Sequence, residues 1–138
     1  MNKEIINNLN NNRPQFLNDL GCTILDVDQE KGICEMEFNI GKQYCHSIDV
    51  IQGGFVTAML DAVSSHAAFV TNPLAVGVST LELKVTFYEA SRAGKLKAIG
   101  KVDKMGRNIA FLSGDLFNEE GLRTASITST AKMLLRKT

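Results

Sequence analysis

Apolar and polar residues alternate along most of this chain, and one long segment with a different period interrupts them. Before the interruption, alternation over residues 22–27 and 32–40, with a turn between them, predicts an antiparallel hairpin. After it, four segments have strand composition: 76–88, 95–104, 108–118 and 123–135. Turn-like breaks separate them, so we expect four strands in meander order.

The interruption at residues 53–70 predicts one long helix. Apolar residues such as Phe55, Met59 and Val63 recur there at spacings of three and four, and most other positions are small. Such a helix is buried, and its small residues let other backbone come close. Asn72 ends it, because a residue before proline avoids helical dihedrals. The element order therefore predicts an α+β fold, in which a curved antiparallel sheet of five to six strands wraps a long central helix.

The first 20 residues are predicted to be an extension, and residues 21–138 one domain. The start is rich in asparagine and is broken by Pro14, after which residues 15–20 predict a short helix closed by Gly21. An open sheet leaves an unpaired edge on each side, and such edges favour association. We therefore expect a dimer with one continuous sheet, and the alternative is a monomeric α+β domain with protected edges.

Composition excludes several classes of protein. The 138 residues suit one globular domain, and the formal net charge of zero argues against coating nucleic acid or an anionic membrane. No apolar stretch approaches the roughly 18 residues of a spanning helix, and the N-terminus lacks a signal-peptide centre. Three cysteines without a C-x-x-C pair predict neither a disulfide framework nor a metal site. We expect a cytoplasmic protein with reduced thiols.

Asp61 and the glycine pair Gly53-Gly54 are the first candidates for chemistry. Asp61 lies among apolar residues of the helix, where a carboxylate is costly unless it is paired or functional. The alternative is a polar helix face that reaches solvent. The glycines precede the helix and expose amide N–H groups at its positive end, which suits an oxyanion, although a tight turn would also explain them.

The two histidines differ in their expected roles. His66 lies five residues after Asp61, on another helix face, which favours a core or interface residue. His46 lies in the loop that leads to the glycines and is the better candidate for a site. A nucleophilic Cys45 beside His46 is an alternative, but neighbours on a strand point apart.

The segment HSIDVIQGGFVTAMLDAVSSHAAF resembles the signature of the PaaI-type acyl-CoA thioesterases, a hotdog-fold family within the 4-hydroxybenzoyl-CoA thioesterase-like superfamily. The usual form is N-x-x-G-x-x-H-G-G, with an acidic residue eight positions after the first glycine of the pair. Gly53, Gly54 and Asp61 match this form in place and spacing. The resemblance continues strand by strand and covers roughly residues 23–135.

Three positions depart from the family form: the asparagine is His46, the loop glycine is Asp49, and the histidine is Gln52. Gln52 can hydrogen-bond a thioester carbonyl or position a neighbour, but it cannot titrate. The resemblance implies that the Gly53 N–H stabilises the carbonyl oxygen and that Asp61, from the partner subunit, activates water or attacks directly. Both routes stay open.

The resemblance also assigns a hydroxyl that holds the attacking water to Ser79. Its neighbour Thr80 points to the opposite face, so only one of them can face the site. Both could equally be ordinary strand residues. The CoA phosphates need cations, and the candidates to bind coenzyme A are Gly54, Arg92, Lys95, Lys104, Arg107 and Asn108.

The resemblance implies a thioester hydrolase that converts an acyl- or aryl-CoA to a carboxylate and free CoA. Its coenzyme A is part of the substrate, so no resident cofactor is expected. The family also implies a homodimer that assembles into a homotetramer. The three departures motivate a different reading, a non-catalytic acyl-CoA binding or sensing protein, and a hydratase-like hotdog protein is the third.

Overall fold

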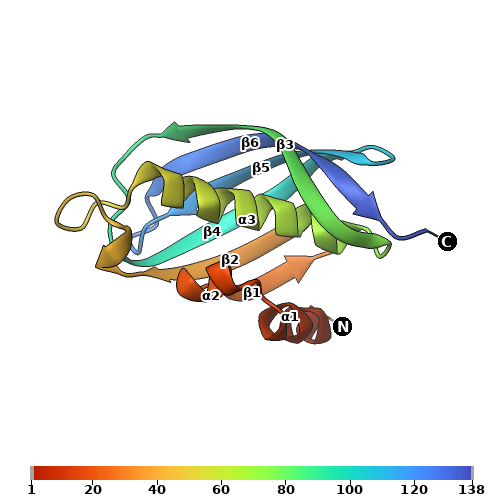
Figure 1. Cartoon of the computed structure of the whole chain (residues 1–138), viewed down its shortest axis with the longest axis horizontal. Helices are drawn as coiled ribbons and strands as arrows, with labels where there is room; N and C mark the ends of the chain where they lie inside the picture. Colours follow the sequence, from red (N-terminus) through yellow and green to blue (C-terminus); the bar gives the residue numbers. More distant parts are fainter. Residues whose placement is uncertain (1, 138) are drawn as a thin grey trace.

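The computed structural model describes residues 2–137 and contains a long helix that lies across one antiparallel sheet (Figure 1). The helices are α1 (Asn2–Asn11), α2 (Gln15–Asp19) and α3 (Gly53–Thr71), and a 3-10 turn, η1, covers Lys42–Tyr44. The strands are β1 (Thr23–Asp28), β2 (Ile33–Ile40), β3 (Ala75–Phe87), β4 (Gly94–Met105), β5 (Ile109–Phe117) and β6 (Arg123–Leu135). The predicted helix and strands agree with these bounds to within a residue or two.

The sheet has six strands in the order β1-β2-β4-β5-β6-β3, and α3 packs against its concave face (Figure 1). This confirms the predicted α+β fold. Gly100 on β4 allows the close approach, because a side chain there would collide with the Val63 carbonyl and come within 2.8 Å of Ser64 Cα. No helix in the described part of the chain is long and apolar enough to cross a membrane.

The predicted meander is wrong for β3. Only β4, β5 and β6 follow one another in space, whereas β3 pairs with β6 at the far edge and β4 pairs with β2. The segment after β3 resembles a hairpin turn in sequence, yet it passes the N-terminal end of α3 and leads to a strand on the other side of the sheet. The Ile51 N–H donates to the Ser91 carbonyl and Val50 bridges Arg92, so these contacts hold the crossover.

The helix α1 was not predicted, because asparagine is a poor helix former. The stabilising contacts come from tertiary packing: Ile5, Ile6 and Leu9 lie on one helix face and pack against the core. Their spacing of three and four residues is the signal that the asparagines obscured. The short helix after Pro14 is confirmed as α2.

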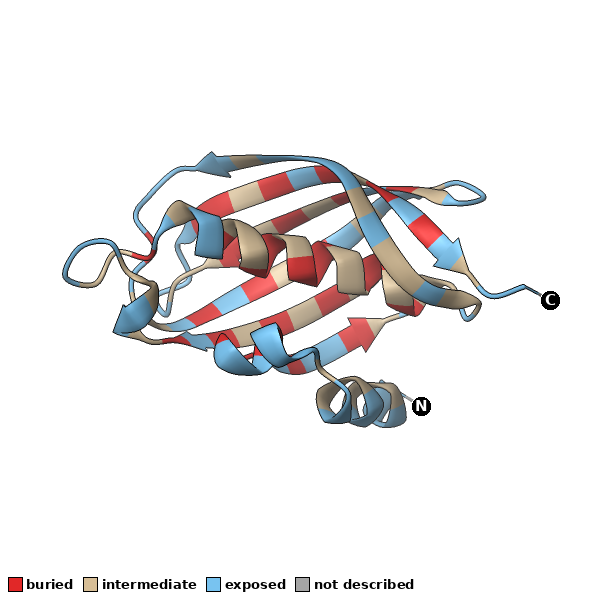
Figure 2. Cartoon of the chain, in the orientation of Figure 1, coloured by how far each residue is buried: buried red, intermediate tan, exposed pale blue. Residues whose placement is uncertain are grey.

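The two edges of the sheet differ. At the β1 edge, the Asn10 side-chain amide donates to the Ile24 carbonyl at 3.0 Å and accepts from the Ile24 N–H at 2.9 Å, as a neighbouring strand would. At the other edge, β3 has no buried residue, while the inner strands alternate between buried and exposed positions (Figure 2). Val76 and Leu81 are 62% and 58% exposed there. Among the described residues, β3 therefore has an unpaired outer edge, and it carries exposed apolar side chains.

Candidate active site

The N-terminus of α3 presents one free amide. Gln52 is the N-cap residue, and its Oε1 accepts the Gly54 N–H at 2.7 Å. The Gly53 N–H has no acceptor among the described residues. Because the first amides of a helix carry its positive partial charge, this N–H is suited to an anionic oxygen. Gln52 thus acts as a helix cap, and the Gly54 amide is occupied while the cap is formed.

Asp61 lies in the middle of α3 and faces β3. The Thr80 hydroxyl donates to Asp61 Oδ1 at 2.7 Å, and the residue is partly buried. Oδ2 has no hydrogen bond within the described residues. The carboxylate is therefore held in one orientation with one oxygen left for a ligand or water.

The hydroxyl beside Asp61 belongs to Thr80, whereas the prediction named Ser79. Strand alternation turns adjacent side chains to opposite faces, so Ser79 points away from α3 and is exposed. Sequence spacing located the strand, but it could not determine which of the two residues faces the helix. In this structure Thr80 is thus the hydroxyl that contacts Asp61, and the role of holding the attacking water stays a prediction.

A cavity of about 480 Å³ adjoins the free amide. It is lined by residues of the loop before α3, the start of α3 and the end of β3, among them His46, Gly53 and Phe87. A Cβ on Gly53 would lie 3.3 Å from the Phe87 ring, so the glycine and this ring are in contact. The structure brings the predicted residues His46 and Gly53 to one cavity, and Phe87 is a lining residue that the sequence did not indicate.

The cysteines have no reactive arrangement. Burial raises the pKa of the Cys22 thiol to about 11 and that of the Cys34 thiol to about 12, so both stay protonated at neutral pH. The His46 ring makes its hydrogen bond to Ser47 Oγ, at 2.8 Å, and none to Cys45 among the described residues. Within residues 2–137, no three His, Cys, Asp or Glu side chains are grouped to hold a metal ion.

The cationic candidates do not form one rim within a single chain. Arg92 precedes β4 and pairs with Asp49 at 2.7 Å, whereas Arg107 and Asn108 follow the far end of that strand. A strand of 12 residues spans about 40 Å. Arg92 and Lys95 therefore lie at one end of the sheet, and Lys104, Arg107 and Asn108 lie at the other.

Gly53 and Asp61 do not meet in one chain either. They are eight residues apart on one continuous helix, and a rise of 1.5 Å per residue separates their backbones by about 12 Å. One thioester carbonyl cannot contact both groups across that distance. The two predicted groups therefore cannot act on one carbonyl within a single chain.

A family model described as the thioesterase superfamily matches residues 49–125, from the loop before Gly53 into β6. The chain belongs to the thioesterase superfamily. The match spans both the free amide and Asp61, and it identifies the protein as a thioester hydrolase.

Relatives and solved structures agree with this membership of the thioesterase superfamily. Acyl-coenzyme A thioesterase 13 of Mus musculus is 30% identical over 98 residues, which cover 70% of this chain and 68% of the relative. A phenylacetic acid degradation-related protein from Ralstonia eutropha superposes with a TM-score of 0.83 at 29% identity, covering 89% of this chain and 92% of that one. The PaaI protein of E. coli superposes with a TM-score of 0.81 at 15% identity, covering 96% and 91%. These similarities confirm the predicted PaaI-type hotdog fold.

Proposed function

We propose that this thioesterase hydrolyses acyl-CoA thioesters, with the Gly53 N–H as oxyanion donor and the Asp61 carboxylate as general base or nucleophile. One observation carries the proposal: a free amide at the N-terminus of α3 and a carboxylate oriented by Thr80 lie on the same helix. The similarity to acyl-coenzyme A thioesterase 13 supports coenzyme A as the thiol.

In the general-base route, Asp61 takes a proton from water while the water oxygen attacks the thioester carbon. The carbonyl oxygen becomes negative and accepts a hydrogen bond from the Gly53 N–H. Collapse of this intermediate breaks the C–S bond, and the CoA thiolate leaves and takes up the proton. In the nucleophilic route, Asp61 attacks the thioester carbon, the C–S bond breaks and the CoA thiolate leaves, and water then hydrolyses the resulting anhydride to the product acid and the free Asp61 carboxylate. Thr80 supports either route, because it holds Oδ1 and leaves Oδ2 free.

The proposal requires two copies of the chain, because Gly53 and Asp61 are about 12 Å apart on one helix. The open edge of β3 supports association there, while Asn10 satisfies both backbone groups of Ile24 at the β1 edge. On β3, Thr80 contacts Asp61 and Phe87 lies against Gly53.

An antiparallel second β3 with Thr80 of one copy opposite Phe87 of the other would therefore bring Asp61 of one copy to Gly53 of its partner. The two-fold axis would pass close to Leu83 and Lys84. The same symmetry would put the Arg92 end of one chain beside the Arg107 end of the other, which gives the separated cations a common location. A dimer of this kind has two equivalent sites.

The test measures CoA release from a panel of aryl and medium-chain acyl-CoAs. We expect Asp61→Asn to lower kcat/KM for the preferred substrate by about 100-fold or more, as loss of a general base or nucleophile would. Asp103→Asn is the matched control, since Asp103 is exposed and bonds only Ser113 among the described residues.

Undiminished hydrolysis by Asp61→Asn would show that Asp61 is not the catalyst. Calorimetric binding of CoA esters without turnover by the wild type would favour the non-catalytic acyl-CoA binding protein. Label in the Asp61 carboxylate after a single turnover in ¹⁸O-labelled water would identify the nucleophilic route, because the general-base route puts the label only in the product acid.

A further inference from the structure

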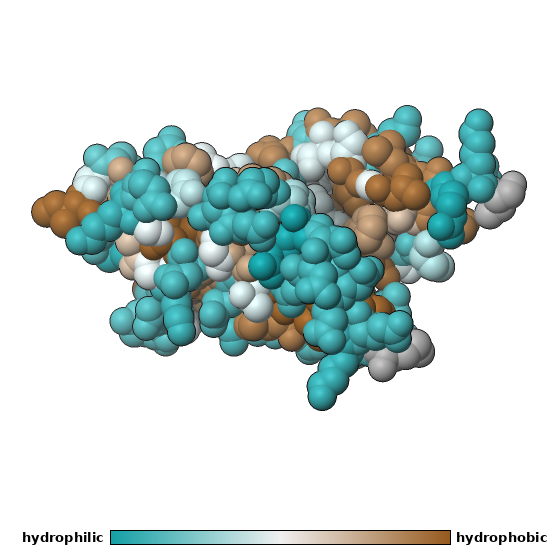
Figure 3. Space-filling view, turned by 60° about the horizontal axis from the view of Figure 1, so that its bottom comes forward, coloured by the Kyte–Doolittle hydropathy of each residue, from teal (hydrophilic) through white to brown (hydrophobic). Residues whose placement is uncertain are grey.

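The loop that leads into α3 has little packing of its own. Residues 41–50 include no buried side chain, and Ile48 is 86% exposed. The loop projects at one end of the molecule, where the space-filling view shows an apolar tip amid hydrophilic residues (Figure 3). A segment with few buried contacts opens easily. Hydrogen bonds to other segments therefore have to hold this loop and the Gly53 amide that follows it.

Backbone hydrogen bonds tie the loop to the crossover, the segment between β3 and β4. The Ile51 N–H donates to the Ser91 carbonyl at 2.8 Å, and the Ala93 N–H donates to the Asp49 carbonyl at 2.8 Å. Both segments line the cavity beside Gly53, so these bonds join two of its walls. Ile51 is two residues before Gly53, and a displacement of the crossover would therefore move the free amide.

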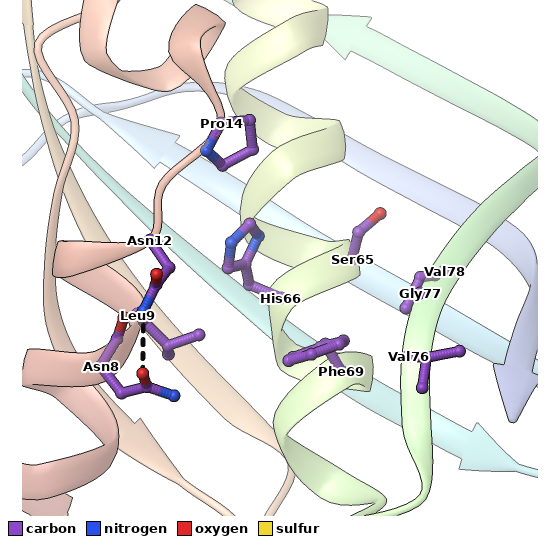
Figure 4. Close-up of a pocket in the computed structure, with 10 residues that line it drawn as sticks. All are labelled: Asn8, Leu9, Asn12, Pro14, Ser65, His66, Phe69, Val76, Gly77 and Val78. Carbon is purple, nitrogen blue, oxygen red and sulfur yellow. Dashed lines mark hydrogen bonds between the residues drawn. The ribbon is translucent and has the colours of Figure 1, made fainter. Parts of the chain in front are cut away.

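The cavity between α1, α3 and β3, of about 490 Å³, is built differently (Figure 4). Among the described residues, no hydrogen bond joins one of its walls to another. Asn8 and Asn12 bond each other within the N-terminal segment at 2.9 Å, and His66 bonds Ala62 of its own helix at 2.8 Å. Hydrogen bonds between walls thus distinguish the cavity beside Gly53 from this one.

A buried pair of hydroxyls anchors the crossover to the sheet. Ser91 Oγ donates to Thr124 Oγ1 at 2.8 Å, and the two residues are 4% and 0% exposed. Thr124 lies on β6, and its Oγ1 donates to the Leu116 carbonyl of β5 at 3.4 Å. The Thr124 carbonyl accepts the N–H groups of Tyr88 and Glu89. A continuous series of hydrogen bonds therefore runs from β5 and β6 through the crossover to the loop before α3.

The contacts of the crossover differ in strength. The ion pair of Arg92 with Asp49 is exposed, and such pairs contribute little because water and salt screen them. The bond between Ser91 and Thr124 is enclosed, and a buried hydroxyl that loses its partner leaves an unsatisfied polar group. The hydroxyl pair therefore fixes the position of the crossover more firmly than the ion pair does.

We propose that Ser91 and Thr124 are positioning residues, which hold the Gly53 N–H in place through the crossover and Ile51. An oxyanion donor stabilises the transition state only where the negative oxygen forms, and a misplacement of about 1 Å can cost about 100-fold in rate. The inference rests on the proposed function, in which Gly53 supplies the oxyanion donor. It adds two residues that act on the reaction only through that amide.

The test measures kcat and KM for CoA release by Thr124→Val, which keeps the shape of the side chain and removes the hydroxyl. We expect kcat to fall by roughly tenfold or more while KM changes little, because the amide acts in the transition state. Ser91→Ala breaks the same bond and should lose a similar factor, and the double variant should lose no more than either single one. Thr124→Ser keeps a hydroxyl and should recover most of the activity.

The matched control is Thr71→Val, which removes a hydroxyl bonded to the Ala67 carbonyl at the other end of α3. Its kcat should stay close to that of wild type. Exchange of the Ile51 amide hydrogen, followed by NMR, should accelerate in Thr124→Val and not in the control, because Ile51 donates to the crossover. Thermal melting of each variant checks that a changed rate does not come from unfolding.

A Gly53→Pro background separates positioning from a general loss of structure. This variant has no amide hydrogen to position, so adding Ser91→Ala should lower kcat no further. An equal further loss there, or undiminished kcat in both Ser91→Ala and Thr124→Val, would overturn the positioning role and leave the proposed hydrolysis intact. Full activity of Gly53→Pro, or no turnover of any thioester by wild type, would instead overturn the proposed function and this role together.

Discussion

Replacing Gly53 with proline removes the atom that the proposed mechanism requires from this residue, its amide hydrogen. Gly53 is the first residue of α3, where the fixed φ and missing N–H of proline are tolerated. Gln52 already has φ −62° and ψ 138°, the extended conformation that a following proline requires. The added Cβ approaches the exposed Phe87 ring at 3.3 Å, a contact that a small ring movement relieves.

The expected loss follows from the loss of one oxyanion donor. Removing such a donor costs about 100- to 1,000-fold in kcat, so Gly53→Pro should be nearly inactive in the CoA-release assay and yet remain folded. Gly53→Ala is the matched control, because it makes the same contact with Phe87 and keeps the N–H. Its loss should be much smaller than that of the proline variant.

A mixture of Gly53→Pro and Asp61→Asn tests whether the two groups come from different chains. In a mixed dimer, the intact Gly53 of one chain faces the intact Asp61 of the other at one site, and both replacements fall at the second site. Random pairing makes about half of the dimers mixed, each with one of two sites intact, so activity should recover to about one quarter of wild type. A mixture as inactive as its components, with mixed dimers detected by native mass spectrometry, would refute the shared site. Full activity of Gly53→Pro alone would refute the oxyanion role.

Three further predictions concern the fold and its response to pH. Asn10→Ala removes both hydrogen bonds to Ile24 and one from Arg13, and should lower the free energy of unfolding by about 1–2 kcal/mol in denaturant titrations. Asn11→Ala, which removes no side-chain hydrogen bond among the described residues, should not. Gly100→Ala forces a methyl group into the backbone of α3 and should cost about 1–3 kcal/mol or more in the same assay. Burial lowers the pKa of His66, so its stabilisation is complete above the unfolded value of 6.5 and is lost as pH falls below it; His66→Gln should therefore lose less stability than wild type between pH 7 and 5.

The local period of the sequence was enough to predict α3 and the strands. The spacing of Phe55, Met59 and Val63 reflects contacts of one helix with the core, and alternation in a strand reflects contacts with one face of the sheet. Both are properties of a short segment. Which strands pair with each other is not a local property, because β3 has the same alternation of polar and apolar residues whether it pairs with β4 or with β6. The meander prediction failed for that reason.

The site was predictable where family spacing fixed a residue on the helix, and not where side-chain direction had to be known. Gly53 and Asp61 follow from the motif, and their catalytic roles stay predictions. Thr80 could not be separated from Ser79, because alternation makes them equivalent until the strand is placed against α3. The role of Gln52 as a helix cap was also missed, because a departure from a motif does not show what the new side chain contacts.

The eight-residue spacing that identifies the motif also implies that one chain is incomplete. On a helix this spacing separates Gly53 from Asp61 by about 12 Å. The two residues of the motif are therefore too far apart to act on one carbonyl within the same chain. Sequence alone leaves two edges where a partner could bind. The structure distinguishes them, because Asn10 pairs with both backbone groups of Ile24 on β1, whereas β3 has no buried residue and, among the described residues, no strand on its outer side. The asparagine-rich start of the chain, which the sequence predicted to be an appendage, therefore covers part of the β1 edge and leaves the β3 edge as the one where we propose that Gly53 and Asp61 of two copies meet.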